Sequence, residues 1–133
     1  MEFHKDGTLP TKGEVFVFGS NLAGIHGAGA AKIAKKKFGA IQGQGRGLMG
    51  QSYAIATKDA ELKTRDLELI RLDIRIFNVY TTISSHANTR WFVTRVGCGL
   101  AGLKDEDIAP MFLAHGGAIN CSFPEEWRKY LES

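Results

Sequence analysis

The chain has 133 residues, of which 44% are hydrophobic and 23% are charged, and its formal net charge is +3. This length suits one domain, and this composition excludes a disordered chain and a fibrous protein. The apolar runs, such as residues 15–18, are far shorter than the roughly 20 residues of a membrane span, and residues 1–12 lack an apolar signal core. We therefore expect one cytoplasmic domain over residues 1–133, with residues 1–12 as an N-terminal extension and no membrane partner.

The first half of the chain alternates between strand and helix patterns. Residues 14–19 are a short apolar run stopped by glycine, which predicts a buried strand. Residues 27–38 place apolar side chains at helical spacing and lysines on the other face, which predicts a helix. Residues 39–50 contain five glycines and predict a loop or an irregular hairpin. Residues 51–56 predict a second strand, which ends beside Lys58.

The second half continues the alternation. The predicted elements are, in chain order, a helix over residues 64–83, a strand over 91–96, a helix over 104–115, a strand over 118–121 and a helix from Pro124. Strands that alternate with helices predict an α/β fold, with a sheet covered by helices on both faces. Ligands of such sheets bind beyond the carboxyl ends of the strands, which is where the glycine-rich segments fall.

The first glycine-rich segment joins the first predicted strand to the first predicted helix. Gly24, Gly27 and Gly29 allow backbone N–H groups to approach a ligand, and a helix start adds unpaired donors that favour a phosphate. Ser20 and Asn21 could instead tie this turn together by local hydrogen bonds. No Gly-Lys-Ser/Thr follows and the Rossmann spacing is missing, which argues against ATP hydrolysis and NAD redox chemistry.

A second glycine-rich turn, residues 96–102, also lies between a predicted strand and a predicted helix. Two such loops could clamp a diphosphate from both sides, although Gly97 and Gly99 could also serve only to permit positive φ angles. Cys98 is interpreted as a small buried hydrophobe, because no partner base lies near it in the sequence. Cys98 and Cys121 are expected to be free thiols.

These two loops resemble those of a known family. The segment SNLAG-IHGAGAA resembles the first phosphate loop of macrodomains, and TRVGCGLAGL is similar to their second phosphate loop. The second match is closest to the branch that contains the terminal ADP-ribose protein glycohydrolases and the ADP-ribose-1″-phosphate processing enzymes. The order of elements agrees over residues 13–121, and the chain also resembles small phage-associated and bacterial proteins with these loops. The resemblance implies a three-layer α/β/α macrodomain-like fold with a mostly parallel or mixed central sheet.

The two loops supply the predicted ligand-binding residues. They are Gly19, Ser20, Asn21, Gly24, His26, Gly27, Ala28, Gly29, Ala30, Gly97, Cys98, Gly99, Leu100 and Ala101. The resemblance implies that Asn21 faces the distal ribose. His26 could donate to a phosphate or act as a general acid, or it could be an exposed loop histidine.

The candidate catalytic residue is Lys58. It matches the lysine with which the glycohydrolase branch attacks the distal ribose, and a lysine there could form a Schiff base with the opened sugar. Lys58 could equally be a solvated side chain beside Asp59. The chain departs from that branch at Ala101, which stands where the branch has an acid/base aspartate. Nor does the sequence identify the aspartate that macrodomains usually place after an early strand to hold adenine.

The sequence therefore predicts a module that binds ADP-ribose or a related nucleotide, free or attached to a macromolecule, without a metal or a cofactor. The alternative is a hydrolase that acts on ADP-ribose derivatives. A purely structural role ranks last, since nine of the sixteen glycines fall between Gly19 and Gly50. A similarity of residues 45–50 to a turn of the lysine-decarboxylase-like phosphoribohydrolases is set aside, because their Pro-Gly-Gly-x-Gly-Thr loop is missing. The lysines of residues 32–37 suit a solvated helix face, so nucleic acid is not predicted as a partner.

Overall fold

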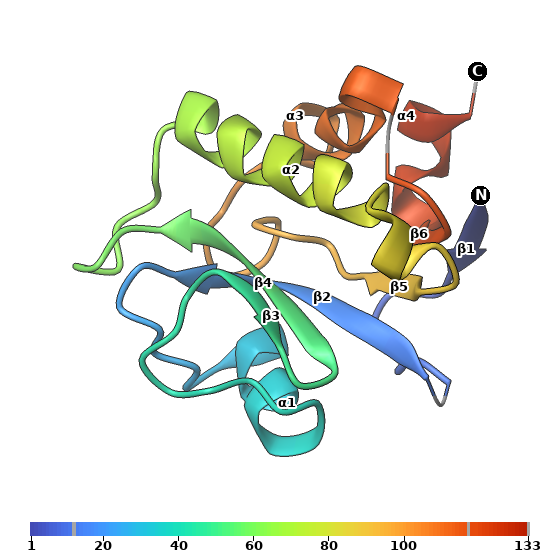
Figure 1. Cartoon of the computed structure of the whole chain (residues 1–133). Helices are drawn as coiled ribbons and strands as arrows, with labels where there is room; N and C mark the ends of the chain where they lie inside the picture. Colours follow the sequence, from blue (N-terminus) through green and yellow to red (C-terminus); the bar gives the residue numbers. More distant parts are fainter. Residues whose placement is uncertain (12, 117, 133) are drawn as a thin grey trace.

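The computed structural model describes residues 1–11, 13–116 and 118–132, which form an α/β fold (Figure 1). The elements are, in chain order, β1 (Glu2–His4), β2 (Glu14–Asn21), α1 (Gly29–Lys37), β3 (Gly47–Met49), β4 (Ser52–Lys58), α2 (Leu67–Thr81), the 3₁₀ turn η1 (Ser84–His86), β5 (Arg90–Val93), α3 (Asp105–Ile108), the 3₁₀ helix η2 (Ala109–Gly116), β6 (Cys121–Pro124), the 3₁₀ turn η3 (Glu125–Trp127) and α4 (Arg128–Leu131).

In the described part of the chain the strands form one mixed sheet of six, in the order β1-β6-β5-β2-β4-β3. The pairs from β1 to β4 are parallel, and β3 alone pairs antiparallel, as a hairpin with β4. Because β2 lies between β5 and β4, the carboxyl ends of these three strands meet at one edge of the sheet. The segments that follow these ends are the two glycine-rich loops and the segment that begins at Asp59.

Each face of the sheet has its own hydrophobic core, since side chains alternate along a strand. From β2, Phe16 and Phe18 pack on the face that carries α1, whose buried residues Ala31 and Ala34 allow close approach. Val15 and Val17 point to the other face. There the core is closed by buried residues of α2, namely Ile70, Ile74 and Phe77. Figure 1 shows α1 on one side of the sheet and α2, α3 and α4 on the other.

The predicted strands at residues 14–19 and 51–56 and the predicted helices at 27–38 and 64–83 are confirmed as β2, β4, α1 and α2. The residues at 39–50 form a loop that ends in the short strand β3, as an irregular hairpin would.

Three boundaries in the second half differ from the prediction. The strand expected over residues 91–96 ends at Val93, because a γ-turn with Val96 N–H donating to Thr94 O (2.7 Å) takes the chain out of the sheet. The helix expected over 104–115 is α-helical only as far as Ile108, since Pro110 has no N–H to continue it. The strand expected over 118–121 begins only at Cys121.

That last shift has a local cause in the residue before β6. Asn120 has φ +57°, a left-handed conformation that asparagine tolerates but that a strand excludes. The start of the chain is a further difference, because residues 2–4 pair with β6 as an edge strand of the sheet. None of the helices in the described part of the chain has the length and apolar character of a membrane span.

A buried ion network ties α2 to the sheet. Asp73 of α2 is 7% exposed and accepts hydrogen bonds from Arg65 Nη1 (2.6 Å) and Arg46 Nη2 (2.5 Å). Arg65 is itself 9% exposed and also donates to the carbonyl of Ala56 in β4 (2.7 Å). Both of its partners are therefore needed to compensate a guanidinium that is largely withdrawn from water.

We predict that Asp73→Ala lowers the free energy of unfolding by about 3–5 kcal/mol, because it leaves Arg65 as an uncompensated buried charge. Urea unfolding measures the change. The matched control is Glu61→Ala, which removes an ion pair with Lys63 between side chains 80% and 77% exposed and should cost less than about 1 kcal/mol. Equal losses in both variants would contradict the structural role of the buried network.

Candidate functional site

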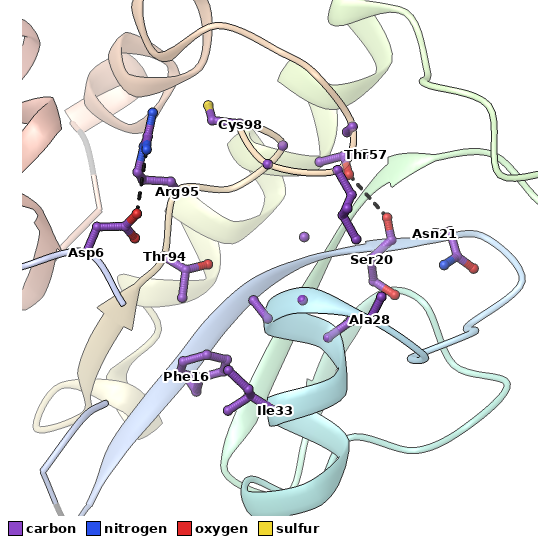
Figure 2. A pocket seen from close by; sticks show the side chains of 18 of the residues that line it. Asp6, Phe16, Ser20, Asn21, Ala28, Ile33, Thr57, Thr94, Arg95 and Cys98 are labelled. Carbon is purple, nitrogen blue, oxygen red and sulfur yellow. Dashed lines mark hydrogen bonds and ion pairs between the residues drawn. The ribbon is translucent and has the colours of Figure 1, made fainter. Parts of the chain in front are cut away.

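A cavity of about 600 Å³ lies at the edge of the sheet where β2, β4 and β5 end (Figure 2). Cavities of this size are typical of small-molecule sites. Its walls come from the first glycine-rich loop and the start of α1, from the second glycine-rich loop, from the end of β4, and from residues 4–9. The cavity thus gathers segments that are up to about a hundred residues apart in the chain.

The first loop and the start of α1 form one wall of this cavity. Gly27, Ala28, Gly29 and Ala30 all line it. Ala28 is the N-cap of α1 and provides no side-chain hydrogen bond to the first turn. The N–H groups of the first helical turn have no acceptor within a helix, and they carry the positive end of its dipole. This end of the cavity therefore suits an anion.

The second loop forms the facing wall with Gly97, Cys98, Gly99, Leu100 and Ala101. The two loops come very close at two points. A Cβ atom at Gly19 would lie 3.2 Å from the backbone nitrogen of Gly97, and one at Gly29 would lie 3.5 Å from Leu100 Cδ1. The predicted pairing of the loops at one site is thus found in the geometry.

Asn21 and Ser20 line the cavity but are held by their own loop. The Asn21 amide clasps the turn, with Nδ2 donating to Ile25 O (2.8 Å) and Oδ1 accepting from Ile25 N–H (3.0 Å). Ser20 is 5% exposed, and its Oγ lies 3.2 Å from His26 Nδ1. Both residues therefore make local hydrogen bonds within the first loop, and both also form part of the cavity wall.

His26 and Gly24 are not among the residues that line the cavity. His26 is 2% exposed, and its Nε2 lies 2.9 Å from the carbonyl oxygens of both Ile41 and Gln44. Because Nε2 faces two carbonyl acceptors it is a donor, and Nδ1 lies within hydrogen-bond distance of the Ser20 hydroxyl. His26 is consequently a buried tie between the first loop and residues 39–50, and not an exposed loop histidine.

Residues 39–50 pack behind the first loop. Gly43 N–H donates to Gly24 O (2.9 Å), and a Cβ atom at Gly45 would overlap the carbonyl oxygen of Asn21. Within the described residues, no member of this segment lines the cavity. The glycines of residues 39–50 allow the backbone of this segment to lie directly against the first loop. The segment therefore supports that loop on the side away from the cavity.

Cys98 has the properties of a structural thiol. Burial and the neighbouring Asp105 carboxylate raise its pKa to about 12, so the sulfur is protonated at neutral pH. The thiol donates to Val96 O at 3.4 Å, and Figure 2 shows the sulfur turned away from Ser20 and Ala28.

Arg95 joins the second loop to the two ends of the chain. Its guanidinium binds Asp105 (Nη2 to Oδ2, 2.6 Å) and lies 3.5 Å from Asp6 Oδ2. Asp105 also accepts from Trp127 Nε1 (2.7 Å). Burial alone would raise the pKa of Asp105, but the hydrogen bonds from Arg95 and Trp127 outweigh it and lower that pKa. Asp105 is thus held as a carboxylate within a structural network.

Lys58 lines the cavity at the end of β4, in register with Asn21 of β2. Ala101, on the second loop, offers no carboxylate, and its carbonyl oxygen accepts from Thr64 Oγ1 (2.8 Å). Asp105 does not replace the missing group, because its oxygens are bound by Arg95 and Trp127. Lys58 therefore has a place in the site but no free acid beside it from the second loop.

Sequence reasoning missed the contribution of residues 4–9. His4, Asp6 and Leu9 all line the cavity, and the ring of His4 stacks on Phe92 with centroids 3.7 Å apart. Burial lowers the pKa of His4, which favours the neutral ring. Asp6 lies two residues after β1, so it is an aspartate that follows an early strand. The strand is three residues long with only one apolar side chain, too short to give a periodic signal.

No protein-family model matches the chain, and no curated protein is significantly similar to it in sequence. Among the described residues, no group of three or more His, Cys, Asp and Glu side chains could hold a metal ion.

Proposed function

We propose that the protein is a macrodomain-like module, with a three-layer α/β/α fold, that binds ADP-ribose or a closely related nucleotide. The observation that carries this proposal is the meeting of two glycine-rich loops across one cavity of about 600 Å³, beside the start of α1. Backbone N–H groups at a helix start and in a facing loop are complementary to the charge of a diphosphate.

The cavity also has a place for a base. Away from the loops its walls are apolar and aromatic, with Phe16, Phe92 and Ile33. Asp6 lies on the segment that borders this end, 41% exposed, and shares Arg95 with Asp105. A carboxylate that lines the same cavity as aromatic rings suits a base that carries an amino group. In the proposed complex Asp6 takes the role of the adenine-binding aspartate of macrodomains.

One prediction of this proposal concerns the two loops. Gly27→Val and Gly99→Val should each weaken ADP-ribose binding at least tenfold, because the new side chain occupies the space through which the backbone approaches the phosphates. Both positions have room for a side chain in the free protein, since a Cβ at Gly27 meets only one methyl group at 4.0 Å and one at Gly99 meets nothing within 4 Å. The fold should therefore be retained.

Calorimetric titration with ADP-ribose measures the effect, with AMP and NAD as comparison ligands and thermal unfolding as the control for folding. Micromolar binding by the wild-type protein that prefers ADP-ribose supports the proposal. Wild-type affinity in both variants would refute the phosphate-loop assignment.

The second prediction concerns the base. Asp6→Ala should reduce the affinity for ADP-ribose roughly tenfold or more, since a hydrogen bond to a charged group is lost. The affinity for the analogue with hypoxanthine, which lacks the 6-amino group, should change little, so the variant no longer distinguishes the two ligands. Asp107→Ala, an exposed carboxylate of α3 outside the cavity, is the control. Discrimination that persists in Asp6→Ala would rule out this role for Asp6.

A hydrolase that acts on ADP-ribose derivatives is the second candidate, and the position of Lys58 favours it. The lysine lines the cavity in register with Asn21, the residue expected to face the distal ribose. Attack of its amine on C1″ of the distal ribose would displace the acceptor side chain of the modified protein, which leaves with a proton, and opening of the sugar ring would give a Schiff base. Water would then hydrolyse the Schiff base, which releases ADP-ribose and restores the free amine.

Turnover of ADP-ribosylated protein should be abolished in Lys58→Ala if this second candidate is correct, while Lys63→Ala, with a side chain 77% exposed, should keep full activity. Borohydride reduction in the presence of ADP-ribose should trap an adduct in the wild-type protein only. Turnover that survives in Lys58→Ala would exclude the Schiff base. A wild-type protein that binds ADP-ribose without any turnover would exclude the hydrolase and support the binding module.

A further inference from the structure

The outer face of α2 carries an apolar stripe that the fold does not cover. Its members are Leu69, Leu72, Ile76 and Val79 of the helix and Ile83 just after it, and each is between 43% and 55% exposed. The inner face of the same helix is fully occupied by the core. A surface helix usually turns polar residues to solvent, so a row of four aliphatic side chains on that face, followed by Ile83, indicates a contact.

The spacing along the helical part of the stripe, from Leu69 to Val79, is three, four and three residues, which matches the repeat of a two-stranded coiled coil. In heptad notation Leu69 and Ile76 occupy a positions, and Leu72 and Val79 occupy d positions, whereas Ile83 follows the helix in an extended conformation. Isoleucine at a and leucine at d favour two parallel strands. We propose that two copies of this chain associate through α2, which pairs in parallel with α2 of the second copy.

The charges beside the stripe fit this parallel arrangement. In a parallel pair each g residue faces the e residue five positions further along the other helix. Glu68, at g, would face position 73 of the second copy, where Asp73 holds the guanidinium of Arg46, a side chain 54% exposed. Arg75, also at g, would face the partly buried ring of Tyr80 of the second copy, a cation–π contact. An antiparallel pair would instead place Arg75 of one copy next to Arg75 of the other copy, which brings two positive charges together.

The stripe alone is short, since 15 helical residues span about 22 Å. The helix is, however, already formed and anchored by its core face, so pairing has no helix-nucleation cost. A further apolar side chain lies at its carboxyl-terminal end, that of Ile119, which is 43% exposed and whose backbone N–H donates to Thr81 Oγ1 (3.1 Å). An association in the micromolar range is therefore expected, independent of any bound nucleotide.

Sedimentation equilibrium of the purified chain over about 1–200 µM tests the association. The wild-type protein should change from monomer to dimer across this range, and Ile76→Lys, at the central a position, should remain monomeric throughout. Ile41→Lys is the matched control, because Ile41 is 54% exposed against 55% for Ile76 but lies outside the stripe, and this variant should dimerise like the wild type. A wild-type protein that stays monomeric, or an Ile76→Lys variant that still dimerises, overturns the proposal.

A cysteine variant tests the parallel direction. In a parallel pair the two residues at position 72 share one layer, so Leu72→Cys should give a disulfide-linked dimer on mild oxidation. The wild-type protein, oxidised in the same way, controls for Cys98 and Cys121. A dimer that Leu72→Cys does not cross-link would contradict the parallel arrangement.

Discussion

Direct contact between backbone segments at the end of β2 is the constraint on which the cavity depends. Gly19 lies so near Gly97 that a side chain there would press on the second loop, and Gly24 and Gly45 bring residues 39–50 against the first loop. Any larger residue at these points would separate the loops that form the walls. The first effect of these glycines is therefore on the protein itself, and the ligand would use the backbone donors that remain at the start of α1.

The electrostatics of the cavity follow from pairs that are already satisfied. Arg95 lies between Asp6 and Asp105, and Trp127 holds Asp105 from the far side, so the position of the second loop depends on both ends of the chain. A carboxylate kept ionised by such partners is poorly suited to exchange protons during a reaction. This arrangement favours a site that holds a charged ligand over one that has a complete acid/base pair, and it leaves Lys58 as the cavity residue on which hydrolysis would depend.

The sequence predicted those parts of the molecule that have a strong period or a strong stop. Residues 14–19 end at glycine, and residues 27–38 have one apolar face, so β2 and α1 were predictable. The edge strand β1 was missed, because three residues cannot show a period, and Asp6 was missed with it. The burial of His26 also could not be predicted, since it depends on the carbonyl groups of Ile41 and Gln44, which only the folded loop brings to its ring.

The helix α2 has apolar side chains on two faces, one buried in the core and one exposed. Its apolar residues at positions 70, 74 and 77 have helical spacing and belong to the core, whereas those at 72 and 76 are exposed. The two sets lie on opposite faces of one helix, and the sequence alone does not assign them to inside and outside. Asp73 lies between the faces. Its buried carboxylate anchors the helix through Arg65 and also binds the exposed guanidinium of Arg46. Loss of this one side chain would therefore weaken both the packing of α2 and any association through its outer face.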